Sequence, residues 1–110
     1  MIIFFSIANV CDANIKLNEL PANTITTNTV LASNKVGFIL TNETKIEDCI
    51  QTCCNQLNCN IAFFKQSKYC YLISCLTEES CIPIENAHKL ATEPIDYMIR
   101  IRSLGIILSL

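Results

Sequence analysis

The stretch Cys49-Ile-Gln-Thr-Cys53-Cys54-Asn-Gln-Leu-Asn-Cys59-Asn-Ile-Ala-Phe-Phe64 holds four cysteines within eleven residues, two of them adjacent, and ends in an apolar run. The chain has four further cysteines, which are Cys11, Cys70, Cys75 and Cys81. Eight cysteines in 110 residues are a high and even number, typical of a small domain cross-linked in an oxidising compartment. We expect all eight to form disulfides, because a domain of this size has a thin core that cross-links can supplement.

The spacing alone does not select one pairing among the many that eight cysteines allow. It argues against a bridge between Cys53 and Cys54, since adjacent cysteines can join only through strained backbone. The other pairings stay open at this point.

Zinc binding and nucleophilic catalysis are the two other uses that cysteines could have. Structural zinc sites usually contain cysteines two residues apart or several histidines, whereas the gaps after Cys54 are four, ten, four and five residues and His88 is the single histidine. A catalytic thiol needs a base, and His88 lies in a polar segment that should be exposed. We therefore expect a protein that is not an enzyme, with no metal site and no cofactor.

The length and the charge limit the other functional classes. A chain of 110 residues has room for one domain. Its formal net charge is −2, with eight basic and ten acidic side chains spread thinly along the chain. No basic face is evident, so we expect no nucleic-acid partner.

The sequence around the cysteine cluster predicts a helix from about Lys45 to Gln56. Thr44 and Glu47 have the spacing of a capping box at its start. A stripe of apolar residues follows at helical spacing, namely Ile46, Cys49, Ile50, Cys53 and Leu57. Cys49 and Cys53 should therefore share the buried face, and Cys54 should point elsewhere toward a different partner.

The rest of the chain predicts a small antiparallel sheet. Residues 60–64 and 69–75 read as the two strands of a hairpin with a turn at 65–68, and residues 36–41 read as another strand. Residues 12–43 otherwise predict loop with short strand pieces, and residues 77–90 predict loop. The fold class should be α+β, with one helix packed on the sheet.

The segment from Ile95 to Arg102 alternates between apolar and charged residues. Ile95, Tyr97, Ile99 and Ile101 would lie on one face of a strand, and Asp96, Arg100 and Arg102 would lie on the other. This pattern predicts a half-buried strand with one face in water.

Both ends of the chain are apolar. Residues 1–8 have the character of a short signal peptide, with the small residues Ser6 and Ala8 before a cleavage site. Residues 103–110 form an apolar tail that is too short to cross a bilayer, which takes about 20 helical residues. A truncated membrane protein and a tail without a role both fit this pattern.

The cysteine pattern and its neighbours resemble the MANSC domain, the motif at the N-terminus with seven cysteines. The resemblance rests on the segment from Cys49 to Phe64, on Tyr69-Cys-Tyr-Leu-Ile-Ser-Cys75 and on Glu79-Ser-Cys81, and it spans about residues 11–102. The form most similar to it belongs to the dyslexia-associated family of single-pass membrane proteins, where a lone cysteine that corresponds to Cys11 precedes the helix. Members of that type continue into repeated immunoglobulin-like domains and a membrane span, which this sequence does not contain.

The resemblance implies a small disulfide-rich PAN/apple-like domain, in which one helix packs on a curved antiparallel sheet. It implies the disulfides Cys49–Cys70 and Cys53–Cys59. Four cysteines would then pair among themselves, with Cys11 joined to one of the other three: Cys54, Cys75 or Cys81.

We expect an extracellular, disulfide-stapled protein-interaction module, the N-terminal part of a cell-surface single-pass membrane protein. Its protein ligand is unknown, its contacts should come from the loops at 12–43 and 77–94, and it would meet a membrane only through an anchor further along the chain. Asn42-Glu-Thr44 is a sequon for N-glycosylation at Asn42. The alternatives are a small secreted effector that acts alone and an intracellular zinc-binding protein.

Overall fold

The structure is a computed structural model that describes residues 10–11, 16–32 and 36–102. The expected signal peptide at 1–8 and the apolar tail at 103–110 lie outside the described residues. The elements, in chain order, are η1 (Leu17–Glu19), η2 (Ala22–Thr24), β1 (Ile25–Thr27), β2 (Thr29–Leu31), β3 (Val36–Leu40), α1 (Ile46–Cys54), β4 (Ile61–Lys65), β5 (Tyr69–Cys75), η3 (Glu79–Cys81), β6 (Pro83–Glu85) and β7 (Tyr97–Arg100).

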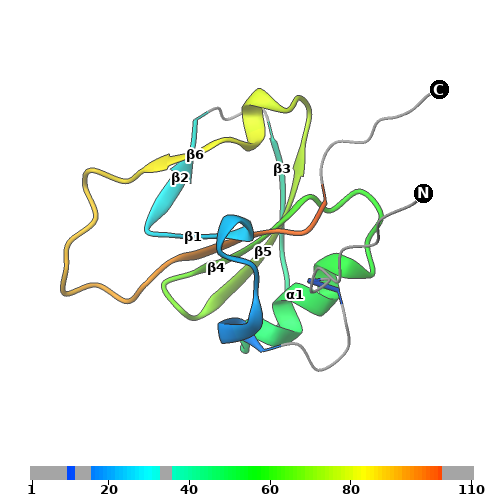
Figure 1. The fold of residues 1–110 in the computed structure, drawn as a ribbon, viewed down its shortest axis with the longest axis horizontal. Helices are drawn as coiled ribbons and strands as arrows, with labels where there is room; N and C mark the ends of the chain where they lie inside the picture. The colour runs from blue at the N-terminus through cyan, green and yellow to red at the C-terminus, as the bar shows by residue number, and fades with distance from the viewer. Residues whose placement is uncertain (1–9, 12–15, 33–35, 103–110) are drawn as a thin grey trace, which may run out of the picture.

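The described strands form two antiparallel sheets (Figure 1). The larger sheet has five strands in the order β1-β7-β4-β5-β3, and the smaller sheet pairs β2 with β6. With α1 packed on the larger sheet and four disulfides, the small α+β, disulfide-rich fold is confirmed.

The predicted hairpin forms the centre of the larger sheet. In it, β4 pairs with β5 from Ile61 opposite Ile73 to Lys65 opposite Tyr69. Gln66 and Ser67 in the turn both have positive φ, at 55° and 53°, which is the signature of a type I′ hairpin turn. The strand expected at 36–41 is also present, as β3, and it pairs with β5 on the side away from β4.

Helix α1 begins later than predicted and lacks the expected capping box. Its N-cap is Lys45, no side chain bonds to the cap position, and Thr44 is exposed. Glu47 lies in the first turn instead, where its negative charge complements the positive end of the helix dipole. Leu57 does not continue the apolar stripe, because the helix ends at Cys54 and this side chain is 90% exposed.

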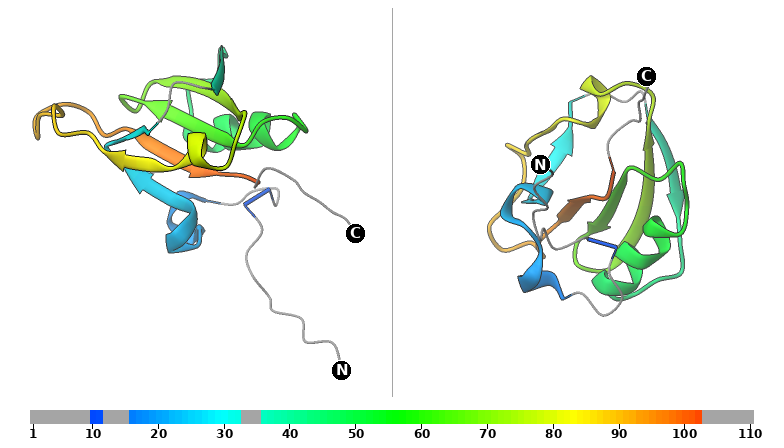
Figure 2. Two further views of the ribbon diagram at one scale, coloured as in Figure 1. Left: turned by 90° about the horizontal axis from the view of Figure 1, so that it is seen from above. Right: turned by 45° about the vertical axis from the view of Figure 1, so that its right-hand side comes forward.

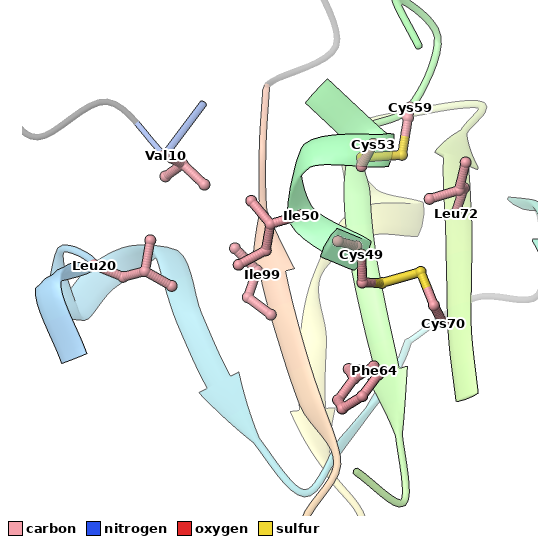
Figure 3. Close-up of a cluster of buried hydrophobic side chains, with 11 residues drawn as sticks. Val10, Leu20, Cys49, Ile50, Cys53, Cys59, Phe64, Cys70, Leu72 and Ile99 are labelled. Carbon is pink, nitrogen blue, oxygen red and sulfur yellow. A yellow bond between two sulfur atoms is a disulfide. The ribbon is translucent and has the colours of Figure 1, made fainter. Parts of the chain in front are cut away.

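Two apolar clusters cover the two faces of the larger sheet. The inner cluster lies between α1 and the sheet, and its buried members include Cys49, Ile50, Phe64, Leu72 and Ile99 (Figure 3). The outer cluster lies on the opposite face, where Leu31 of β2 and Cys81 of η3 pack against residues from β4, β5 and β7: Ile61, Ile73 and Met98. The domain therefore has a second layer that the sequence pattern did not predict.

The second layer changes the environment of β7. The prediction of one wet face is wrong, because Met98 and Asp96 are buried at 4% and 5% exposure while Ile95 is 41% exposed. Ile99 packs in the inner cluster and Met98 packs in the outer one, so both faces of β7 are covered.

The segments predicted as loops contain short regular elements. Residues 12–43 include η1, η2, β1 and β2, and residues 77–90, expected to be loop throughout, include η3 and β6. Three-residue strands such as β6 have too few residues to show a period in the sequence, and their pairing with distant segments defines them.

Candidate functional site

The disulfides fix the framework on which any functional surface is held. The structure joins Cys49 to Cys70 and Cys53 to Cys59, the two pairs that the family resemblance implies, with Cα–Cα distances of 5.6 and 5.3 Å. Both begin on the buried face of α1: Cys49 reaches β5, and Cys53 reaches the residue that closes the turn after the helix (Figure 3). Cys49–Cys70 thus ties the helix to the hairpin, and Cys53–Cys59, one helical turn further along, ties the helix to the turn that leads into β4.

The remaining cysteines pair as Cys11–Cys54 and Cys75–Cys81, each with a Cα–Cα distance of 5.6 Å. Cys54 faces away from its neighbour Cys53 and ties the N-terminal segment to α1. Cys75, the last residue of β5, is tied to Cys81 in η3 and so holds the second layer against the end of the hairpin.

An apolar groove of about 340 Å³ lies on the outer face of the sheet. We call it the outer groove. Its floor comes from β4, β5 and β7, and its walls come from β2 and β3. The lining residues are Val30, Leu31, Ala32, Phe38, Phe63, Lys65, Ile73 and Met98.

Strand periodicity explains how these side chains meet. Phe38 is opposite Ile73 in the pairing of β3 with β5, and Phe63 is opposite Met98 in the pairing of β4 with β7. Residues opposite each other in a sheet share a face, so all four project to the outer face. Tyr71 lies between the two phenylalanines, with ring centroids 6.3 Å from Phe38 and 6.1 Å from Phe63.

The lining of the outer groove is mainly apolar. Two phenylalanine rings and several aliphatic side chains provide apolar contact area, Tyr71 packs beside both rings, and Lys65 is the one charged side chain among the described lining residues. Val30 and Phe38 are exposed at 38% and 54%, so the groove is open to a partner. Small concave apolar surfaces with one or two polar groups are common binding sites.

The structure places the other predicted site residues apart from this groove. Asn42 is exposed just after β3, where its side chain is accessible to a glycosyltransferase. His88 is exposed, and its backbone amide donates to Asn86 Oδ1 at 3.1 Å. Of the loops expected to carry contacts, 12–43 contributes Val30, Leu31, Ala32 and Phe38 to the groove, and the described lining includes no residue of 77–94.

Sequence reasoning did not single out Phe38, Phe63 or Lys65 as surface residues. Once residues 36–40 and 61–65 are taken as strands, strand geometry places alternate residues of each on a shared face. Which face is left open depends on where β2 and β6 pack, and that depends on pairing between segments more than fifty residues apart.

The described residues contain neither a cluster of metal ligands nor a membrane-spanning helix. Among residues 10–11, 16–32 and 36–102, no three histidine, cysteine or acidic side chains gather as metal ligands would. None of the helices in that part of the chain has the length and apolar character needed to span a membrane.

Residues 19–92 match the model of a protein family, the dyslexia-associated protein KIAA0319 N-terminal domain. The chain belongs to this family. The matched region contains α1, the β4–β5 hairpin and every described residue that lines the outer groove except Met98, and it includes three complete disulfides. Cys11, which forms the fourth disulfide, and β7 lie outside it. A search of curated proteins gave no match to this chain.

Proposed function

We propose that the chain is an extracellular protein-interaction module of a cell-surface single-pass membrane protein, and that it binds a protein ligand through the outer groove. The observation that carries the proposal is an open aromatic groove held on a domain with four disulfides. Disulfides of this number are typical of secreted and cell-surface domains. Membership of the KIAA0319 N-terminal family supports the same location.

The finer features of the proposal follow from the sequence. The resemblance to the MANSC domain favours a PAN/apple-like module that recognises protein and has neither enzymatic activity nor nucleic-acid binding. The segment that anchors the protein in the membrane would lie outside this domain. The exposed Asn42, followed by an exposed Thr44, would carry an N-linked glycan in the secretory pathway.

The mechanism that we propose is recognition by a pre-organised surface. The bridge Cys49–Cys70 holds β5 against α1, and β4 is paired with β5, so the two strands that carry the packed rings of Phe63 and Tyr71 need little rearrangement on binding. Pre-organisation of this kind improves affinity because less conformational entropy is lost when the partner binds. Lys65 at the groove would favour a ligand with an acidic group near its apolar contact.

A binding screen with matched variants tests this function. The secreted, disulfide-intact chain is presented to an array of recombinant extracellular domains, together with Val30→Glu and Lys65→Glu in the groove. Leu57→Glu is the control, because Leu57 is 90% exposed and does not line the groove. We expect a partner whose binding weakens roughly tenfold or more with each groove variant and is unchanged with the control, as loss of an interface contact of about 1–2 kcal/mol requires. Partners that bind all variants equally would refute the groove as the site.

Glycosylation is tested separately. Removal of N-linked glycans from the secreted chain should lower its mass, and Asn42→Gln should abolish that change. An unchanged mass on enzymatic deglycosylation of the wild-type chain would rule out this modification.

A further inference from the structure

Strand β3 is an unprotected edge of the larger sheet. It pairs with β5 on one side, and in the described part of the chain no strand pairs with its other side (Figure 2, right). Its residues Val36-Gly-Phe-Ile-Leu40 contain no charge and no proline, and they pair with β5 in five unbroken steps. Phe38, Ile39 and Leu40 are 54%, 59% and 56% exposed. Soluble proteins usually protect such an edge with a charge, a proline or a bulge.

The hydrogen-bonding pattern shows which backbone groups of β3 are available. The amide of Thr41 donates to the carbonyl oxygen of Cys70 at 2.9 Å. In an antiparallel pair, residues alternate between bonding to the neighbouring strand and pointing away from it. Gly37 and Ile39 therefore bond to β5, while the amide and carbonyl groups of the alternate residues point outward, namely those of Val36, Phe38 and Leu40.

We propose that two copies of this chain associate by antiparallel pairing of their β3 strands about a two-fold axis at Phe38. In this register Phe38 lies opposite Phe38 of the second copy, and Val36 lies opposite its Leu40. The outward-pointing amide and carbonyl groups on each strand then meet their counterparts, and the two larger sheets join into one of ten strands. This inference rests on the backbone of β3, whereas ligand binding is proposed for the outer groove; Phe38 is the one described residue that the two surfaces share.

Charge and side-chain size both favour a second copy as the occupant. The strand is uncharged, so self-pairing places no like charges opposite each other. The register also sets Ile39 opposite Gly37 of the second copy, where the absence of a side chain leaves room for it. An added Cβ at Gly37 would meet only the Ser74 side chain and carbonyl, at 3.9 and 4.0 Å, so the position is open.

The area of the contact predicts a weak dimer. An aromatic side chain has roughly 150–250 Å² of surface; with that range as an upper guide, half-exposure leaves roughly 100 Å² on each of Phe38, Ile39 and Leu40. Three such side chains on each of two copies give roughly 600 Å², which is below the roughly 1,200 Å² of a typical stable interface. The association should therefore depend on concentration.

A charge-swap experiment at the two-fold axis tests the proposal. The average mass of the wild-type chain, measured by sedimentation equilibrium, should rise toward that of a dimer between about 10 μM and about 1 mM, the range of a weak interface. Phe38→Lys and Phe38→Glu should each stay monomeric up to concentrations roughly tenfold higher than those at which the wild-type chain associates, because like charges then lie opposite each other. An equimolar mixture of the two variants should associate again. Leu90→Lys, at another exposed leucine, should behave like wild type.

Amide exchange of the wild-type chain provides a test that needs no variant. The amides of Phe38 and Leu40 should exchange fast in dilute protein and slow down as the concentration rises, while the amides of Gly37 and Ile39 should be protected throughout.

A wild-type chain that is monomeric up to about 1 mM overturns the proposal. A dimer in which the exchange rates of the Phe38 and Leu40 amides do not change also overturns it. Retained ligand binding by such a monomer would leave the groove function standing, so the two failures can be told apart. A second protein that protects these amides, while the chain alone stays monomeric, would assign the edge to that protein and would also overturn self-pairing.

Discussion

Arg102 closes the C-terminal end of α1 by donating from Nη2 to the carbonyl oxygen of Cys54 at 2.9 Å, across 48 residues of sequence. Its Nη1 donates to the carbonyl oxygens of Cys53, Gln56 and Cys59. The last carbonyl groups of a helix have no partner within the helix, and this guanidinium provides one from the segment after β7. The side chain therefore joins the helix and the turn that follows it to the segment after β7.

Replacement of Arg102 by methionine should lower the free energy of unfolding by about 2–3 kcal/mol, because it removes hydrogen bonds from a charged donor. Arg102→Lys should recover only part of the loss, since an ammonium group does not reproduce the fork of the guanidinium. Urea unfolding of the disulfide-intact protein measures both. The control is Arg100→Met, which breaks an exposed ion pair with Glu78 and should cost less than about 1 kcal/mol. Equal losses for the two methionine variants would contradict this role of Arg102.

Lys89 and Asp96 form an ion pair 3.1 Å long in which each side chain is 7% exposed. Asp96 Oδ1 also accepts from the amide of Gln66 at 2.6 Å, so the carboxylate ties the hairpin turn to the segment before β7. Lys89→Met should reduce the free energy of unfolding by about 3 kcal/mol, since it leaves a buried carboxylate without its cation. Lys68→Met at an exposed lysine is the matched control for chemical denaturation. A loss below about 1 kcal/mol would show that the pair behaves as a surface pair.

A substitution in the turn of the β4–β5 hairpin should increase the stability of the domain. Gln66 has a φ of 55°, a conformation that asparagine adopts more readily than glutamine and that β-branched residues resist. Gln66→Asn should raise the free energy of unfolding by about 0.5 kcal/mol, and Gln66→Val should lower it by about 1–2 kcal/mol. Thermal unfolding should thus shift in opposite directions for the two variants. Shifts in the same direction would mean that backbone strain at this position is not what the substitutions change.

The sequence predicted those elements that their own residues define. The apolar stripe at helical spacing indicated the buried face of α1, and runs of β-branched and aromatic residues indicated β3 and the hairpin of β4 and β5. Asp96 and Arg102 were placed in water because charged side chains on alternate positions usually are. Asp96 is buried in an ion pair with Lys89 from the segment just before β7, and Arg102 bonds to the carbonyl group of Cys54 in α1, 48 residues away. Neither contact is visible in the alternation of the strand itself.

The outer groove could not be predicted for a related reason. Phe38 and Phe63 were expected in strands, but their open surroundings depend on where β2 and β6 pack on the sheet. The capping box at Thr44 is absent because the four-residue pattern from Thr44 to Glu47 does not by itself determine where the first helical turn begins: the helix starts with Lys45 as its cap. The pairing of distant segments therefore determines the features that local sequence patterns do not predict.

The four disulfides should contribute unequally to stability. In the chain-entropy model, the bridge Cys11–Cys54, which spans 43 residues, stabilises the folded state by about 4 kcal/mol, and Cys75–Cys81, which spans 6, by about 2 kcal/mol. Replacement of each pair by two alanines, followed by urea unfolding, should show this order. A larger loss for the short loop would mean that packing around Cys75 and Cys81 outweighs the restriction of the unfolded chain.

The pairing of the eight cysteines underlies both the fold and the proposed extracellular function, and peptide mapping of the unreduced secreted protein tests it most directly. Stepwise partial reduction and alkylation before digestion separates the bonds of the adjacent Cys53 and Cys54. The structure predicts no free thiol and four links: Cys11–Cys54, Cys49–Cys70, Cys53–Cys59 and Cys75–Cys81. Free thiols at most of these positions, or a link from Cys49 to any residue other than Cys70, would contradict the account.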